Sequence, residues 1–130
     1  MRMILIAGLL LLALQPTMGP ALADRAGQRG YVEHGEASWY GPGFDGEETA
    51  SGEVFDQTDL TAAHPELPFG TEVTVTNLEN GKEVTVEIND RGPYAKGRII
   101  DLSKEAGRRL DIISGGTAEV RIEATTEPQQ

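Results

Sequence analysis

The sequence predicts a mainly β fold, a small barrel of short strands with one short helix. Several short stretches alternate apolar and polar side chains, which is the period of a strand with one buried face. An asparagine–glycine pair stands between two of these stretches, as in a β-hairpin. Helices do not alternate with the strands, so a compact barrel is favoured over a parallel sheet.

The hairpin is expected around Asn80 and Gly81. Residues 73–76 and 84–88 alternate apolar and polar side chains on either side of this pair. Both residues of the pair tolerate positive φ, which a tight hairpin turn requires. The apolar members of the two strands are therefore expected to face one core: Val73, Val75, Val84, Val86 and Ile88.

Two more strands and the helix are expected further along the chain. Residues 118–123 form a third alternating run, and residues 98–101 give a shorter one. Between them the hydroxyl of Ser103 can accept an otherwise unpaired backbone N–H, which predicts a helix from this cap through about Leu110. A glycine pair, Gly115-Gly116, then marks the return to the last strand.

The N-terminus predicts export. Residues 1–23 combine a positive start, an apolar run and an Ala-Leu-Ala end, so a signal peptide cleaved before Asp24 is expected. A membrane anchor is the alternative, but a spanning helix needs about 20 apolar residues, and this run is interrupted from Gln15 onward. Residues 24–34 are expected to be a flexible lead-in, residues 35–124 a single barrel domain, and residues 125–130 a disordered tail.

Charge and cysteine content exclude several classes of partner. The chain carries 11 basic and 21 acidic residues, a balance opposite to that of nucleic-acid-binding proteins. It has no cysteine, hence no disulfide and no lipid-modified cysteine. No cluster of histidines or cysteines has metal-ligand spacing, so neither a metal nor a cofactor is expected. The predicted mature protein is soluble, periplasmic or secreted, without a membrane anchor, and monomeric.

Two carboxylates stand in contexts that suit chemistry. Asp90 follows the strand at 84–88 and precedes Arg91-Gly92-Pro93, where glycine and proline force a turn. An Asx-turn or a pair with Arg91 is the structural alternative for Asp90. Glu53 follows Gly52, and from the residues alone a rim carboxylate is favoured there. Cleavage of a glycosidic bond calls for a protonated carboxyl group, and a second carboxyl nearby is one way to keep it so.

One histidine and several aromatic residues complete the candidate set. His64 precedes Pro65, and a lone histidine in such a run is more often structural than catalytic. Trp39 and Tyr40 are adjacent in an expected strand, so one ring is expected in the core and the other against a sugar ring. Further candidates for a glycan-facing surface are Phe44 and Tyr94, whereas Phe55 and Phe69 are expected in the core.

Five short motifs together resemble the rare lipoprotein A family of septal-ring lytic transglycosylases. They lie at residues 37–41, 49–53, 61–64, 88–94 and 98–103, and the resemblance covers about residues 35–123. It implies a six-stranded double-psi β-barrel. It also implies that Glu53, His64 and Asp90 are the catalytic residues, with a substrate-binding surface formed by Trp39, Tyr40, Phe44, Arg91 and Tyr94.

The resemblance implies an activity as well. Such enzymes cut the MurNAc–GlcNAc bond of peptidoglycan strands that lack stem peptides, and they leave 1,6-anhydro ends without consuming water or a cofactor. In the mechanism expected here, Asp90 protonates the leaving oxygen and then takes the proton of the 6-hydroxyl. Glu53 would help to keep the Asp90 carboxyl protonated and to stabilise the oxocarbenium-like transition state, and His64 would orient one of the two carboxyls. The two acids could exchange these roles.

The sequence departs from the family in two ways, and it leaves a second function open. The family often has Phe-His-Gly and Phe-Asp-Met where this chain has Phe44-Asp45-Gly46 and Phe55-Asp56-Gln57, and no glycan-binding domain follows Glu123. The alternative function is a non-catalytic, expansin-like module that binds wall polysaccharide. Barrels of this kind serve both roles, so the fold cannot decide between them. Two acids at one site favour the enzyme.

Overall fold

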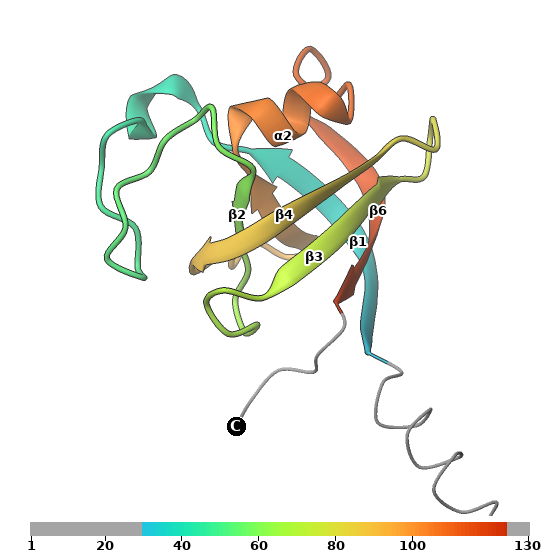
Figure 1. The fold of residues 1–130 in the computed structure, drawn as a ribbon. Helices are drawn as coiled ribbons and strands as arrows, with labels where there is room; N and C mark the ends of the chain where they lie inside the picture. The colour runs from blue at the N-terminus through green and yellow to red at the C-terminus, as the bar shows by residue number, and fades with distance from the viewer. Residues whose placement is uncertain (1–29, 125–130) are drawn as a thin grey trace, which may run out of the picture.

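The computed structural model describes residues 30–124, which form one closed barrel (Figure 1). Around the barrel the strands follow the order β1-β5-β2-β4-β3-β6. Their bounds are β1 Tyr31–Trp39, β2 Thr61–Ala63, β3 Glu72–Asn77, β4 Glu83–Asp90, β5 Arg98–Leu102 and β6 Thr117–Ala124. The predicted signal peptide, the start of the lead-in and the tail lie outside the described residues. Within residues 30–124, no helix is long and apolar enough to cross a membrane.

The barrel mixes parallel and antiparallel pairs. β1 runs parallel to β5 and β2 parallel to β4, while the remaining neighbours are antiparallel. The predicted hairpin is confirmed as β3–β4, with Val73 opposite Val86 and Val75 opposite Val84. All five apolar side chains expected to share a core are at most 6% exposed. Alternation in the sequence therefore predicted the buried face of both strands correctly.

Strand β1 corrects the sequence-based boundary. Residues 31–34 were expected in the flexible lead-in, but they pair with the end of β6, from Tyr31 opposite Ala124 to His34 opposite Arg121. The alternation is inverted here, because Val32 is 44% exposed while the polar Glu33 is half-buried. An apolar-inward pattern therefore cannot identify this strand. β2 was also missed as a strand, since three small residues are too few to show a period.

The helix is confirmed where it was expected. α2 (Lys104–Arg109) begins after Ser103, whose Oγ accepts the Ala106 N–H at 3.2 Å, and Leu110 caps its C-terminus. It packs over one end of the barrel against β1, β4 and β5 (Figure 1). The other long connection runs from the 3-10 turn η1 (Pro42–Phe44) to β2 and lies outside the barrel (Figure 1). This connection carries one of the predicted catalytic residues.

Substitution of Gly81 by valine is expected to destabilise the protein by about 1–2 kcal/mol, because Gly81 has φ +79° and a left-handed backbone is unfavourable for an L side chain. Urea unfolding is the measurement. No atom lies within 4 Å of the position of an added Cβ, so the loss would come from the backbone alone. Gly43→Val is the matched control, since Gly43 has equally open space without a positive φ. Equal stability of the two variants would contradict the turn assignment.

Candidate active site

Asp90, the last residue of β4, lies where several donors converge on its carboxyl group. Tyr40 donates its hydroxyl hydrogen to Oδ2 at 2.6 Å. The backbone N–H groups of Ala50 and Arg91 donate to Oδ1, each at 2.9 Å. These three donors fix the position and orientation of the carboxyl group. The half-buried Asp90 side chain is thus prepared for proton transfer.

A hollow of about 500 Å³ opens beside Asp90. All five predicted substrate-binding residues are among those that line it, and four of them are aromatic: Trp39, Tyr40, Phe44 and Tyr94. Phe44 is 50% and Tyr94 79% exposed, so both rings present a face to solvent. Aromatic rings beside a carboxyl group suit a ligand that combines apolar ring faces with hydroxyl groups. These residues come together as the sequence predicted.

Tyr40 has a different task from the stacking that was expected. Its ring is held between Phe55, stacked at 4.5 Å between centroids, and Phe44, edge-on at 5.5 Å. Burial, and after it the hydrogen bond to Asp90, raises the pKa of Tyr40 well above its ordinary value. The hydroxyl therefore stays protonated and remains a fixed donor to the carboxylate. The Tyr40 ring forms part of the wall of the hollow, and its hydroxyl is hydrogen-bonded to Asp90.

The raised pKa of Tyr40 predicts a loss of stability in alkali. In the unfolded chain a tyrosine ionises around pH 10, whereas Tyr40 keeps its proton in the native state. Above pH 10 the unfolded state therefore binds fewer protons, and the free energy of unfolding falls as the pH rises. Urea unfolding between pH 8 and about 11 is expected to show a shallower fall in Tyr40→Phe than in the wild type. An unchanged slope would contradict the assignment, and the exposed Tyr94→Phe is the control.

Glu53 is tied to the same strand end but faces away from Asp90. Asn89 donates from Nδ2 to Glu53 Oε1 at 3.1 Å, and the Ser51 N–H donates to the Asn89 carbonyl at 3.2 Å. Glu53 lines a second hollow, of about 510 Å³, together with Asp56, Asp59 and Glu87. The two predicted catalytic acids are thus linked by the 49–53 loop but line different hollows.

His64 does not make the contact expected of it. Its side chain is buried, at 1% exposure, and Nε2 lies 3.0 Å from Glu33 Oε1. Among the hydrogen bonds of residues 30–124, none joins its imidazole to the carboxyl of Asp90 or Glu53. Its backbone is closer to the site, because the His64 N–H donates to the Asp90 carbonyl at 3.1 Å. The carboxyl that this histidine orients is that of Glu33.

Arg91 was expected to bind substrate, but its side chain is engaged within the protein. Nη1 donates to the carbonyls of Leu67 and His64, at 2.9 and 3.1 Å. The guanidinium lies over the ring of Phe69, 4.1 Å from its centroid, so Phe69 is a partner of Arg91 and is 42% exposed, not the core residue that was expected. Arg91 borders the hollow. Its backbone N–H is hydrogen-bonded to the Asp90 carboxyl, and its guanidinium is hydrogen-bonded to carbonyls of the 64–67 turn.

Three further acidic residues line the hollow of Asp90 and were not singled out from the sequence: Glu47, Glu48 and Asp101. Asp101 of β5 lines the same hollow as Asp90, accepts a hydrogen bond from Ser38 Oγ and pairs with Arg98 Nη2 at 2.6 Å. The available signal was an acid inside an otherwise apolar strand. No group of three or more His, Cys, Asp or Glu side chains in residues 30–124 is arranged to hold a metal ion.

Comparison with known proteins identifies similar sequences. The family described as "Lytic transglycolase" matches residues 32–122. "Endolytic peptidoglycan transglycosylase RlpA" of Campylobacter jejuni is 55% identical over 94 residues, which are 72% of this chain and 34% of that protein. The "probable" protein of the same name from Synechocystis is 58% identical over 92 residues, 71% of this chain and 29% of that protein. This chain spans about a third of the length of the curated relatives it matches.

Solved structures support the fold. A Streptomyces papain inhibitor matches with a TM-score of 0.61 and 22% identity, covering 74% of this chain and 96% of that chain. The apo expansin of Clavibacter michiganensis matches with a TM-score of 0.57 and 21% identity, covering 77% of this chain and 53% of that chain. At these identities the likeness concerns the backbone alone. The predicted six-stranded double-psi β-barrel with one short helix is confirmed.

Proposed function

Because the chain belongs to the lytic transglycosylase family of double-psi β-barrels, as the rare lipoprotein A resemblance predicted, we propose that it cleaves peptidoglycan glycan strands as an endolytic transglycosylase. The bond is the one between MurNAc and GlcNAc, in strands without stem peptides, and the products carry 1,6-anhydro ends. The protein acts as an exported monomer after loss of residues 1–23, on the wall side of the cytoplasmic membrane.

The observation that carries this proposal is the position of Asp90 beside an aromatic-lined hollow. The reaction needs one group that delivers a proton to the leaving oxygen and then removes a proton from the 6-hydroxyl. A carboxyl group held in one orientation by three donors can serve both steps from the same position. Phe44 and Tyr94 supply exposed ring faces for sugar rings on either side of the scissile bond.

In the proposed mechanism Asp90 gives up one proton and takes back one proton. Its carboxylic acid protonates the O4 of GlcNAc as the bond from O4 to the MurNAc C1 breaks. The MurNAc O6 then bonds to the same C1, and the Asp90 carboxylate takes the O6 proton, so water is neither added nor lost. Asp101, which lines the same hollow and is held in place by its ion pair with Arg98, is the carboxylate assigned to stabilise the positive charge that develops at C1 and the ring oxygen.

Glu53 has a supporting role in this mechanism. It accepts a hydrogen bond from Asn89, and its backbone carbonyl accepts the Thr49 N–H at 2.7 Å. Both contacts close the 49–53 loop, which places the Ala50 N–H against Asp90 Oδ1. Glu53 thus acts on Asp90 through this loop. The arrangement explains how an acid that faces another hollow can matter to the reaction.

Digestion of defined glycans tests the proposal. The protein spanning residues 24–130 is incubated with peptide-free strands, with peptide-bearing strands and with cellulose, and soluble products are analysed by mass spectrometry. We expect anhydro-ended fragments from the peptide-free strands in particular. Sedimentation with the insoluble polysaccharides and no fragments would contradict the enzyme and favour the expansin-like binding module.

A further inference from the structure

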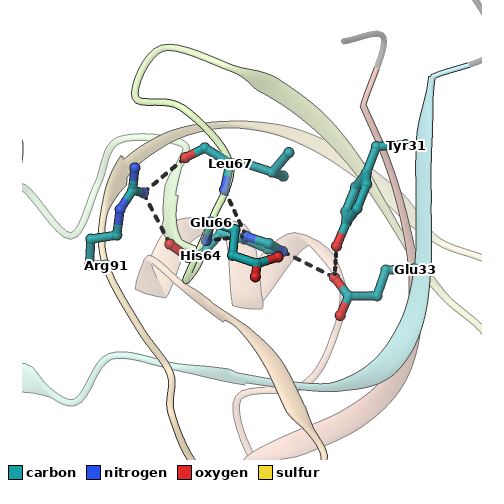
Figure 2. Close-up of polar contacts among 6 residues, drawn as sticks. All are labelled: Tyr31, Glu33, His64, Glu66, Leu67 and Arg91. Carbon is teal, nitrogen blue, oxygen red and sulfur yellow. Dashed lines mark hydrogen bonds and ion pairs between the residues drawn. The ribbon is translucent and has the colours of Figure 1, made fainter. Parts of the chain in front are cut away.

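A buried histidine organises the turn that holds the catalytic strand end (Figure 2). The His64 Nδ1 atom accepts the backbone N–H groups of Glu66 and Leu67, at 3.0 and 3.1 Å. A ring nitrogen that accepts carries no hydrogen, so the hydrogen of the neutral imidazole is on Nε2. Nε2 therefore donates to Glu33 Oε1 at 3.0 Å. One side chain thus ties the 64–67 turn to strand β1.

Glu33 is itself fixed from the other side. Tyr31 donates its hydroxyl hydrogen to the same Oε1 atom at 2.7 Å. Burial, and then the hydrogen bond to Glu33, raises the pKa of Tyr31 well above its ordinary value, so Tyr31 remains a donor. Its ring also packs edge-on against the imidazole, at 5.9 Å between centroids. Glu33 is 32% exposed and His64 only 1%, so the chain of contacts runs from the barrel surface inward.

The 64–67 turn is also hydrogen-bonded to Asp90 and Arg91. Figure 2 shows Arg91 on the far side of the turn from Tyr31 and Glu33, with its guanidinium directed at the carbonyls of His64 and Leu67. The backbone N–H of the same arginine donates to Asp90 Oδ1, and the His64 N–H donates to the Asp90 carbonyl. The peptide unit that follows the Asp90 side chain is thereby fixed to one turn.

We propose that Glu33 and His64 are positioning residues for Asp90: the Glu33–His64 hydrogen bond sets the 64–67 turn, and the turn sets the orientation of the Asp90 carboxyl through Arg91. The inference rests on the proposed function of Asp90. His64 then serves the reaction as a neutral hydrogen-bonding residue, without contact with the sugar. Glu33, which neither the sequence nor the resemblance singled out, acts only through its contact with His64.

Two conservative variants of Glu33 distinguish the position of its acceptor oxygen from its negative charge. Glu33→Gln keeps the acceptor oxygen at its position but removes the charge, and kcat is expected within about 3-fold of the wild type. Glu33→Asp keeps the charge but withdraws the oxygen by one methylene, and kcat is expected to fall roughly 10- to 100-fold with KM nearly unchanged. The exposed Glu72→Ala, at the start of β3, is the control for loss of a strand carboxylate. An impaired Gln variant with an active Asp variant would overturn the proposal.

A second measurement does not depend on activity. The Ala50 and Arg91 amide hydrogens point at the Asp90 carboxyl, so their NMR shifts report its position. We expect both shifts to change in Glu33→Asp and to stay at wild-type values in Glu33→Gln and Glu72→Ala. Unchanged shifts in Glu33→Asp would overturn the positioning role. If the wild type releases no fragments while these shifts follow the expected pattern, the proposed function fails and the positioning of Asp90 stands.

Discussion

Replacement of Asp90 by asparagine is expected to lower turnover of peptide-free glycan strands by roughly 100-fold or more. Asparagine keeps an oxygen where the Ala50 and Arg91 N–H groups donate, and its amide can donate to the Tyr40 hydroxyl oxygen. What it loses is the proton that cycles between the leaving oxygen and the 6-hydroxyl. The change therefore removes the chemistry and leaves the contacts of the strand end in place.

The control for this prediction is folding and binding. Asp90→Asn is expected to unfold within a few degrees of the wild type and to sediment with glycan strands to the same extent. A release rate equal to that of the wild type would remove Asp90 from the mechanism. A variant that is unfolded would point instead to the alternative reading of Asp90 as a residue that only shapes the turn.

Variants at Asp101 and Glu53 are expected to differ in a way that separates charge from contact. Asp101→Asn removes one carboxylate, the partner of Arg98, from the hollow of Asp90, and kcat is expected to fall roughly 10-fold or more. Glu53→Gln keeps the oxygen that accepts from Asn89, so kcat is expected within about 3-fold of the wild type. Glu53→Ala leaves Asn89 without this partner and is expected to be clearly slower than Glu53→Gln. Steady-state kinetics on peptide-free strands is the measurement.

The opposite order would change the mechanism. If Glu53→Gln were as inactive as Asp90→Asn while Asp101→Asn kept its activity, the ionisable proton of Glu53 would be needed. The reaction would then use the pair of acids that the family resemblance implies, and the 49–53 loop would have to bring Glu53 into the hollow of Asp90. Glu87→Gln, an exposed carboxylate in the hollow of Glu53, is the matched control.

The sequence predicted those elements whose local chemistry matches their environment. Strands β3 and β4 show a clear period of two because one face of each is buried and the other is not. The helix α2 was found from the Ser103 cap, which acts over three residues. Asp90 was found because a strand end followed by glycine and proline is itself a local signal. All of these interactions lie close together in the chain.

What the sequence could not predict depends on contacts between distant segments. Glu33 and His64 are 31 residues apart. Because the half-buried Glu33 is polar, β1 lacks the apolar-inward alternation that identifies a strand. The divergence of Glu53 from Asp90 follows from how one loop lies across the end of β4. The residue type of Arg91 suggested sugar binding, but tertiary packing directs its guanidinium to the 64–67 turn. Residue types alone do not encode these directions.

The most direct measurement of the central claim is digestion of peptide-free glycan strands in oxygen-18 water, with mass spectrometry of the new ends. A lytic transglycosylase closes the MurNAc 6-oxygen onto C1, so the account predicts 1,6-anhydro ends, lighter by one water than reducing ends and free of the label. Asp90→Asn is expected to abolish their appearance. Labelled reducing ends, or intact strands after incubation with the folded wild type, would contradict the account.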